Sequence, residues 1–568
     1  MTVTDSATGT APVRPGTRPP RAGRSNGQWK VDGAEPLNAN ETWKQEDGGL
    51  NVRERIEQIY SREGFASIPP QDLSGRFRWW GLYTQRRPGI DGGRTAQLDD
   101  TELSDEYFML RVRLDGGAIS LAQLRVLAEI SHEFARGTAD ISDRQNIQYH
   151  WIRVEDVPEI WRHLEAVGLQ TTEACGDTPR VILGSPLAGV AQDEIIDPTP
   201  VIDEILDRYI GDPELANLPR KFKSAITGHP SLDVVHEIND ISLVGVIHPE
   251  LGAGYDLWVG GGLSTSPRLA ERVGVFVRPE EAAEVWHGVI RIFRDYGYRR
   301  LRNKARLKFL LAEWGPEKFR QVLQDEYLER ELPDGPPPAP ASGPGDHVGV
   351  HRQKDGLSWV GVTVVSGRIG GERLGQVADL ARRHGSGRVR VTVAQNILVL
   401  DVPDHQVEPL RAGLAELGLD SDPSEFRRGA LACTGIEFCK LALVETKNRT
   451  DALITELERR LPGFDTPLSI HVNGCPNACA RTQVADIGLK GMVIPDPATG
   501  DYVEGYQVHL GGAIGPEAGL ARKTRALKVS AADLPDYVER VALRYLAQRE
   551  PAESFAHWAR RADEEDLR

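Results

Sequence analysis

The sequence predicts an α+β fold that contains two copies of one structural unit. Residue n matches residue n+250 without a gap between residues 112 and 169, and this register includes the tripeptide Gln-Asn-Ile at 145–147 and 395–397. Further along, "GYDLWVGG" from Gly254 matches "GYQVHLGG" from Gly505 at an offset of 251. A single register kept over this length indicates an internal duplication.

Hydrophobic patterns inside the first copy predict its elements in order. "NVRERIEQIYSREG" (51–64) has the spacing of a helix. The segments "YFMLRVRL" (107–114) and "NIQYHWIRV" (146–154) alternate as strands do, and the amphipathic "LAQLRVLAEISHEFA" (121–135) between them predicts a helix. Each copy is therefore expected to begin as a β-rich unit and to continue as an α/β unit.

Two segments lack this periodicity. Residues 1–50 begin with a stretch rich in Pro, Gly, Arg and Ser, and we expect them to form a flexible N-terminal arm. The proline- and glycine-rich residues 333–348 are the clearest interior linker, and they separate the two copies.

Composition excludes several classes of protein. The net charge of −15 argues against general binding to nucleic acid or to an anionic membrane, because both need a basic surface. The sequence shows no run of about 18 apolar residues and no apolar signal segment, so we expect a cytoplasmic protein. Its five cysteines are too few for a disulfide framework and suit a reducing compartment in which thiolates bind metals.

Four cysteines form two closely spaced pairs. Cys433 and Cys439 are six residues apart, and Cys475 and Cys479 are four residues apart around Pro476, in a segment that we expect to enter a helix. Four thiolates suffice for one [4Fe–4S] cluster. A zinc site or unconnected buried thiols remain alternatives, although the first spacing fits zinc poorly.

The two copies differ at the second cysteine pair. An offset of 246 aligns Cys475 with His229 and Cys479 with Asp233. Only the second copy has thiols at these positions, and we expect the chemistry to lie where the duplicates diverge.

The cysteine pattern resembles that of a known family. Cys433 and Cys439, followed after about 35 residues by "NGCPNAC" (473–479), resemble the sirohaem and [4Fe–4S] site of the sulfite and nitrite reductases. The resemblance covers the chain from about residue 50 and implies that all four cysteines bind the cluster, and that Cys479 also bridges to the sirohaem iron. It also implies ferredoxin-like half-domains and larger mixed α/β sirohaem-binding domains. The expected boundaries are 51–175 and 349–425 for the half-domains, and 176–332 and 426–568 for the α/β domains.

The resemblance also implies a basic substrate site. Arg111, Arg180, Lys221 and Lys223 match the family's substrate-binding positions. Lys221 and Lys223 are two residues apart, which on a strand places both side chains on one face. Because sulfite is an oxyanion and its reduction consumes protons, such a site needs cations that polarise S–O bonds and deliver protons.

Further positions resemble contacts to the carboxylates of sirohaem. These are Arg144, Gln148 and Lys308, and less clearly Asn146, Gln395 and Asn396. The repeated Gln-Asn-Ile segment is equally consistent with a shared structural turn. The resemblance also places Tyr83 among the catalytic residues, at a position that borders the family's substrate pocket. Tyr83 and Cys175 resemble a pair that carries a covalent thioether in some members, and an inert buried thiol beside an unrelated tyrosine is the alternative.

These features favour an assimilatory, ferredoxin-dependent sulfite reductase, and we expect it to be a monomer. Nothing resembling a nucleotide-binding glycine motif lies between a strand and a helix, so electrons are expected from a partner. An acidic ferredoxin could dock on arginine-rich segments such as 86–94 and 296–308. Ferredoxin–nitrite reductase is the nearest alternative, and Lys223 favours the dianionic sulfite. A monooxygenase of corrin biosynthesis is a remote alternative that lacks this set of basic residues.

Overall fold

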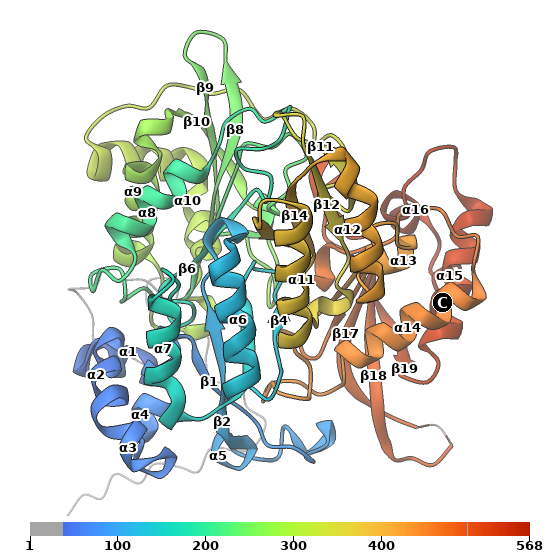
Figure 1. Cartoon of the computed structure of the whole chain (residues 1–568), viewed down its shortest axis with the longest axis horizontal. Coiled ribbons are helices and arrows are strands. Elements are labelled where there is room, and N and C mark those ends of the chain that lie inside the picture. The colour runs from blue at the N-terminus through green and yellow to red at the C-terminus, as the bar shows by residue number, and fades with distance from the viewer. Residues whose placement is uncertain (1–37, 497) are drawn as a thin grey trace, which may run out of the picture.

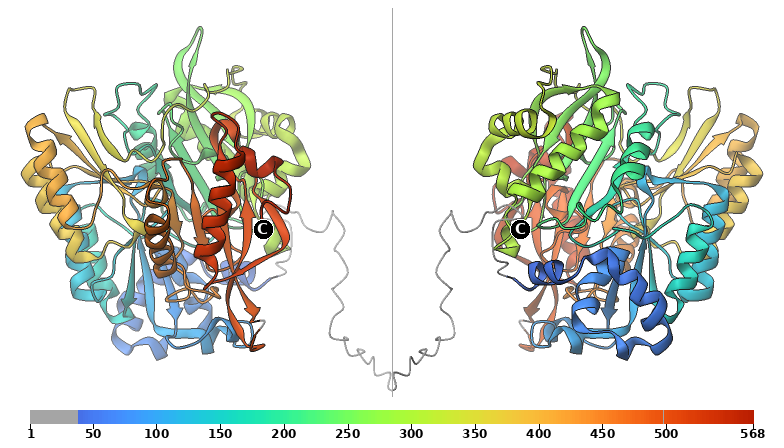
Figure 2. Two further views of the ribbon diagram at one scale, coloured as in Figure 1. Left: turned by 90° about the vertical axis from the view of Figure 1, so that its right-hand side faces the viewer. Right: turned by 90° about the vertical axis from the view of Figure 1, so that its left-hand side faces the viewer.

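The computed structural model describes residues 38–496 and 498–568, which form four β-sheets with helices packed on their faces (Figure 1). The helices of the two half-domains, α6 and α11, face the viewer in Figure 1 and lie along one side of the molecule in Figure 2, and the two α/β domains pack behind and beside them. The predicted internal duplication is confirmed, because the strand connectivity of the two α/β sheets is the same.

The first half-domain contains the strands and the helix that the sequence predicts. Its sheet has the order β1-β2-β5-β4, and α6 begins with a capping box in which Ser120 and Gln123 bond each other's backbone. Leu124, Leu127 and Ile130 face the core from α6 at helical spacing. The elements are β1 (Leu82–Arg86), β2 (Ser104–Val112), α6 (Leu121–Phe134), β4 (Asp140–Ile141), β5 (Ile147–Ile152) and α7 (Val157–Glu165).

The second half-domain repeats this arrangement and borrows one strand from the first. Its sheet has the order β11-β12-β14-β13-β3, in which the short β3 (Ala118–Ile119) comes from the first copy and pairs with β13. The remaining elements are β11 (Gly349–Arg352), β12 (Ser358–Val362), α11 (Gly371–His384), β13 (Val389–Val391), β14 (Ile397–Val402) and α12 (Asp404–Glu416). Helices α6 and α11 lie side by side (Figure 1), and one hydrophobic core serves both half-domains.

Two glutamines join the copies by equivalent hydrogen bonds. Gln145 Nε2 donates to the carbonyl oxygen of Val391 in the second copy (2.9 Å), and Gln395 Nε2 donates to that of Ile141 in the first (3.1 Å). Positions 141 and 391 are themselves equivalent at the offset of 250. Both glutamines have left-handed backbone, which fixes the same turn in each copy.

Each α/β domain has a five-stranded sheet with three parallel strands followed by two antiparallel ones. The first contains β6 (Pro179–Gly184), α8 (Thr199–Tyr209), β7 (Phe222–Thr227), β8 (Ile241–His248), β9 (Gly252–Val259), β10 (Glu271–Val277), α9 (Ala282–Tyr296) and α10 (Leu307–Val322). The second contains α13 (Glu425–Arg428), β15 (Ala430–Ala432), α14 (Lys447–Arg460), β16 (Ile470–Asn473), β17 (Ile487–Pro495), β18 (Tyr502–Leu510), β19 (Arg522–Ser530), α15 (Leu534–Gln548) and α16 (Phe555–Arg561).

The expectation of a flexible arm over residues 1–50 is wrong for its last part. Residues 1–37 lie outside the described residues, whereas α1 (Ala39–Glu46) is capped by Asn38 and fastened by buried ion pairs. Lys44 Nζ lies 2.6 Å from Glu41 and 3.4 Å from Asp177, and Arg299 also pairs with Glu41 at 2.9 Å. The short helices that follow are α2 (Val52–Arg55), α3 (Ser61–Glu63), α4 (Pro70–Leu73) and α5 (Asp100–Leu103).

The segment between the copies is extended and fastened to both of them. Gly335 N donates to Gly274 O (3.2 Å), and Ser342 N donates to Pro230 O (3.0 Å) in the first copy. Near its end, Asp346 accepts two hydrogen bonds from Arg428 of the second copy. The proline-rich composition therefore marks a connection with few internal hydrogen bonds and specific anchors.

Candidate active site

The paired lysines lie where β7 begins. Phe222 between them is fully buried in the core of the first α/β domain, so Lys221 and Lys223 lie on the opposite face, as the two-residue spacing predicts. The Lys223 backbone N–H donates to Asp240 Oδ2 (2.9 Å), which fixes the start of the strand. Both side chains are half-buried.

The predicted arginines lie on neighbouring elements. Arg111 is near the end of β2, where its Nη2 donates to Gln148 Oε1 on the paired strand β5 (2.8 Å) and its Nη1 to Cys175 Sγ (3.0 Å). Arg180 on β6 donates from Nε and Nη2 to Gly176 O (3.0 and 2.7 Å). The sheet register thus brings Arg111 and Gln148, both predicted from the sequence, into direct contact.

The basic residues form one group in which positive charges outnumber the nearby carboxylate of Asp143. Among the described residues, none of a set of five forms an ion pair with a carboxylate: Arg111, Arg144, Arg180, Lys221 and Lys223. Burial, followed by the charge of the nearby Arg306, lowers the pKa of Lys221 to about 7. Burial also lowers the pKa of Lys223, and neighbouring Arg144 acts in the same direction. Cations that lower each other's pKa provide a strong attraction for an anion.

The four predicted cluster cysteines lie together in the second α/β domain. Cys433 follows β15, Cys475 follows the adjacent parallel strand β16, and the backbone N–H of Gly474 donates to Cys433 Sγ (3.2 Å). The pKa of Cys475 is raised by burial first, and then by the thiols of Cys479, Cys439 and Cys433. Thiols so arranged become thiolates when a metal neutralises their charge.

The loop that carries the second cysteine pair does not enter an α-helix, so that expectation is wrong. It is a series of turns in which Ala478 and Arg481 have left-handed backbone, followed by a short 3₁₀ turn. Asn473 holds the loop: its Nδ2 donates to Cys475 O (2.6 Å) and its Oδ1 accepts from Ala480 N (2.8 Å). Sequence reasoning missed this role, although Asn473 is the first residue of the "NGCPNAC" segment.

The basic group and the cysteines adjoin each other. Cys479, the most exposed of the four thiols, lies close enough to Lys221 and Arg111 to act on both side chains: it partly opposes the lowering of the Lys221 pKa and contributes to raising the pKa of Arg111. The first copy therefore supplies cations and the second supplies thiols to one site. This is the arrangement expected of a duplicated fold that binds its ligand between the copies.

The residues present fit a large polycarboxylate cofactor beside these thiols. Several buried polar atoms of the described residues have no hydrogen-bond partner: Arg111 Nε, Arg144 Nε, Asn146 Oδ1, Asn396 Nδ2 and Arg481 Nε. Arg144 also donates to Asn239 Oδ1 (3.0 Å), and burial lowers its pKa to about 10. Unpaired buried donors and cations are costly unless a ligand satisfies them, and the carboxylates of sirohaem would do so.

Two predicted cofactor contacts already have protein partners. Lys308 Nζ donates to the carbonyl oxygens of Gly262, Leu263 and Thr265 at 3.0 to 3.2 Å, so it supports that loop. Gln395 uses its amide on Ile141 and on both backbone groups of Ala432, which favours the structural reading of the repeated turn. Contact of either side chain with sirohaem stays a prediction.

Tyr83 and Cys175 lie near each other at the edge of this group. Tyr83 is on β1, opposite Met109 of β2, and Cys175 is fully buried. Burial and the neighbouring Cys175 thiol raise the pKa of Tyr83, while Arg180 and Arg111 lower it. The predicted thioether between the two residues stays a prediction.

Together, the duplicated α+β fold, the four thiols and the basic group suit an iron–sulfur protein with an anion site between its two copies. Comparison with family models agrees. The "Nitrite and sulphite reductase 4Fe-4S domain" matches residues 175–332 and 425–568, and the "Nitrite/Sulfite reductase ferredoxin-like half domain" matches residues 102–167 and 350–417. The chain belongs to the nitrite and sulfite reductase family.

Individual relatives are similar over nearly the whole chain. "Sulfite reductase [ferredoxin] 2" of Mycolicibacterium paratuberculosis is 58% identical over 97% of this chain and 100% of its own length. A ferredoxin–nitrite reductase of Synechococcus elongatus is 35% identical over 92% of this chain and 98% of its own. The solved structure of Mycobacterium tuberculosis NirA superimposes with a TM-score of 0.93 at 57% identity, covering 96% of this chain and all of that one.

Proposed function

We propose that this chain is an assimilatory, ferredoxin-dependent sulfite reductase that carries out the six-electron reduction of sulfite to sulfide. The observation that carries the proposal is the group of basic side chains without carboxylate partners, which lies against Cys479. The greater similarity to curated sulfite reductases than to nitrite reductases supports the choice of substrate.

The chain's own residues bind and orient the anion. Arg111 and Arg180 present planar guanidinium groups, and Lys221 and Lys223 present ammonium groups from one face of β7. These groups stabilise charge on the substrate oxygens and hold protons at Nζ and Nη where oxygen leaves as water. Sirohaem and the cluster, when bound, supply electrons one at a time. Cys433, Cys439, Cys475 and Cys479 would hold the cluster.

Sulfite is distinguished from nitrite by its charge. Two adjacent lysines favour a dianion over a monoanion, because each added cation contributes more Coulomb energy to the more highly charged ligand. The test compares kcat/KM for sulfite and nitrite with reduced ferredoxin and holoenzyme. We expect sulfite to be preferred and Lys223→Asn to lower the sulfite-to-nitrite ratio. A large preference for nitrite in the wild type would assign the chain to nitrite reduction instead.

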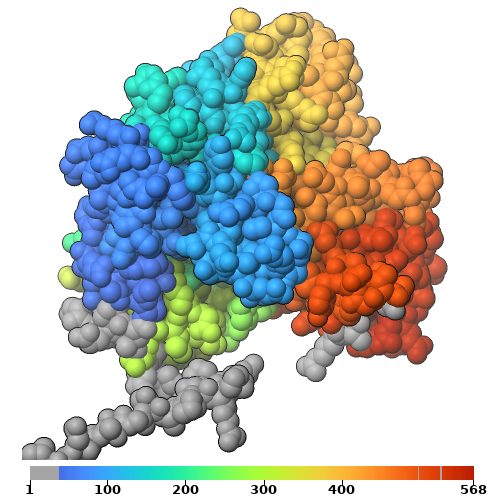
Figure 3. Space-filling view, turned by 90° about the horizontal axis from the view of Figure 1, so that it is seen from below, coloured from blue at the N-terminus to red at the C-terminus, as the bar shows by residue number. Residues whose placement is uncertain are grey.

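This chain offers the electron donor a basic surface next to the cluster loop. Arg86 N donates to Phe438 O (2.8 Å), and Arg86 Nη1 donates to Ala442 O (3.1 Å), so the segment 86–94 lies against the loop that carries Cys439. Figure 3 shows the face on which this N-terminal part of the chain adjoins the second copy. Arg87 and Arg94 are exposed there. We therefore place the ferredoxin on this segment.

The other arginine-rich segment, 296–308, is less suited to docking. Arg299 pairs with Glu41, Arg302 with Asp177 and Arg306 with Asp240, so these charges face inward.

A charge reversal separates docking from chemistry. We expect Arg87→Glu to raise KM for ferredoxin at least several-fold, with a weaker salt dependence, while activity with a small-molecule reductant stays unchanged. Arg382→Glu on the exposed surface of α11 is the matched control and should behave as the wild type. Equal KM values for the two variants would show that the donor docks elsewhere.

We further propose a cytoplasmic monomer that binds neither nucleic acid nor membrane. The net charge of −15 supports this, and no helix in the described part of the chain is long and apolar enough to cross a bilayer. Light scattering of the holoenzyme tests the oligomeric state, and a mass near 62.6 kDa is expected.

A further inference from the structure

The first copy contains a counterpart of the cysteine loop. The loop after β7 and the loop after β16 have the same backbone conformation at an offset of 246. Matching positions are left-handed in both loops: Leu232 with Ala478, and Val235 with Arg481. A short 3₁₀ turn then follows in each loop. A backbone that positions two metal ligands in one copy is thus present in the other.

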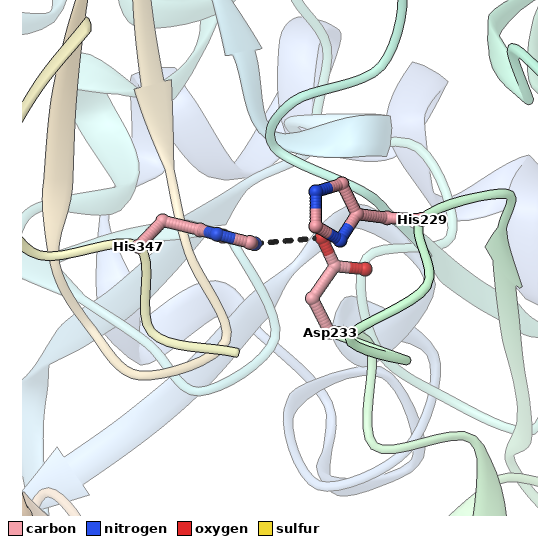
Figure 4. Close-up of side chains that lie close together, drawn as sticks. All are labelled: His229, Asp233 and His347. Atoms are coloured by element: carbon pink, nitrogen blue, oxygen red, sulfur yellow. Dashed lines mark hydrogen bonds and ion pairs between the residues drawn. The ribbon is translucent and has the colours of Figure 1, made fainter. Parts of the chain in front are cut away.

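The positions of the two cysteines are taken by metal-binding residue types. His229 stands for Cys475 and Asp233 for Cys479, and His347 from the connecting segment approaches the pair from the other side (Figure 4). All three side chains are buried, and one ligand atom from each lies within 4.8 Å of the others. His347 Nε2 is 2.8 Å from Asp233 Oδ2.

Other side chains orient these groups as outer partners do in metal sites. Asp233 accepts hydrogen bonds from Ser185 Oγ (2.7 Å) and Thr227 Oγ1 (2.8 Å), which fix its carboxylate. His229 Nδ1 lies 2.8 Å from Ser231 Oγ, and His229 Nε2 lies 3.6 Å from Asp193 Oδ1. The Ser231 backbone N–H donates to His229 Nδ1 (3.2 Å), so the ring proton is on Nε2, on the side of Asp193, until a metal binds.

We propose that His229, Asp233 and His347 bind a divalent transition-metal ion of the Zn²⁺ class. Two imidazoles and one carboxylate suit Zn²⁺, whereas Mg²⁺ and Ca²⁺ prefer oxygen ligands. Ligand atoms about 2.0–2.2 Å from a tetrahedral zinc lie about 3.3–3.6 Å apart, so the 2.8 Å between His347 Nε2 and Asp233 Oδ2 would have to widen by roughly half an ångström. A water molecule or the exposed Asp193 would occupy the fourth coordination position of the ion.

Such an ion would be structural and separate from the redox chemistry. His347 lies at the end of the connecting segment, immediately before β11, while His229 and Asp233 belong to the first α/β domain. The ion therefore fastens the connection between the copies to the first of them. The proposal does not depend on the substrate of the enzyme.

The test measures zinc in holoenzyme dialysed against a mild chelator and then against ZnCl₂, with cluster absorbance as the check of integrity. We expect about one tightly bound Zn²⁺ per chain in addition to the iron. Zinc X-ray absorption should show only nitrogen and oxygen neighbours at about 2.0–2.1 Å. A sulfur shell at about 2.3 Å would place the zinc on the cysteines, and an absence of tight zinc would leave only a hydrogen-bonded Asp–His pair. Either result overturns the proposal.

Variants locate the ion. We expect His347→Gln and Asp233→Asn each to weaken Zn²⁺ binding roughly 100-fold or more, since even outer partners contribute up to that factor. His351→Gln is the matched control, because His351 lies four residues away and bonds the Val348 carbonyl (3.0 Å) instead. Wild-type affinity in both ligand variants would refute the site. If His347→Gln does not fold, Asp233→Asn and the wild-type absorption spectrum decide the question.

Discussion

Replacement of Gln395 by alanine tests whether this side chain supports the fold or contacts the cofactor. Its amide makes three hydrogen bonds: Nε2 donates to Ile141 O and Ala432 O (3.1 Å each), and Oε1 accepts from Ala432 N (3.3 Å). All of these groups are buried. The substitution therefore removes three hydrogen bonds to buried backbone groups.

The expected loss follows from these contacts. At about 1 kcal/mol for each net hydrogen bond, the variant should lose roughly 3 kcal/mol. For a cooperative unit of about 150–250 residues, such as the two half-domains together, Tm shifts by about 2–4 °C per kcal/mol. The Tm of the half-domains should therefore fall by roughly 6–12 °C. KM for sulfite should stay within about twofold of the wild type, because on this view the amide touches only backbone.

The duplication supplies the matched comparison. Gln145 makes the equivalent set of bonds, to Gly184 O (3.0 Å), Gly184 N (3.1 Å) and Val391 O (2.9 Å). Gln145→Ala should therefore lower the calorimetric Tm by a similar amount. A Tm drop below about 2 °C for Gln395→Ala, together with loss of sirohaem from the purified protein, would show that the side chain is a cofactor contact.

Three further predictions concern single residues. Cys479→Ser should abolish both cluster absorbance and sulfite reduction, and retention of both would refute its role as a ligand. If Tyr83 and Cys175 are joined, the intact mass of the demetallated chain is lower by two hydrogens, whereas Cys175→Ala shows no such deficit. Burial raises the pKa of Glu173 to about 8, above its unfolded value of about 4.3. As the pH rises from the lower to the higher of these values, only the unfolded state loses the proton, so the free energy of unfolding of the wild type decreases. The Tm advantage of Glu173→Gln should accordingly grow from pH 5 to pH 8, and a constant difference would contradict this.

Much of the fold follows from local pattern. The alternation in 107–114 and the helical spacing in 121–135 each produce the expected element, because both bury one apolar face. The pairing of β3 from the first copy with β13 of the second could not be predicted, because a two-residue strand has too short a hydrophobic pattern to indicate which sheet it joins. The sequence predicts an arm that reaches residue 50, whereas α1 already forms before it. Tertiary ion pairs of Lys44 and Glu41 stabilise this helix, and no local sequence pattern indicates them.

The candidate site divides in the same way. The spacing that predicts Lys221 and Lys223 on one face acts within a single strand, and the structure has that arrangement. The carbonyl partners of Lys308 come from residues more than 40 positions away, so sequence spacing could not reveal them. The helix expected after Pro476 fails because the left-handed residues that shape the loop are not glycines and give no sequence signal.

The strand exchange has a consequence for biosynthesis. Ile119 pairs with Val389, so a ribosome must add 270 more residues (389 − 119) before the sheet that contains β3 can close. Until then the nascent chain exposes apolar surface from the core that both half-domains share. The N-terminal copy expressed alone should therefore aggregate or recruit chaperones, and it should become soluble when the other copy is synthesised in the same cell. If the gene were split at the connecting segment, the two encoded halves would have to be synthesised together for either of them to fold.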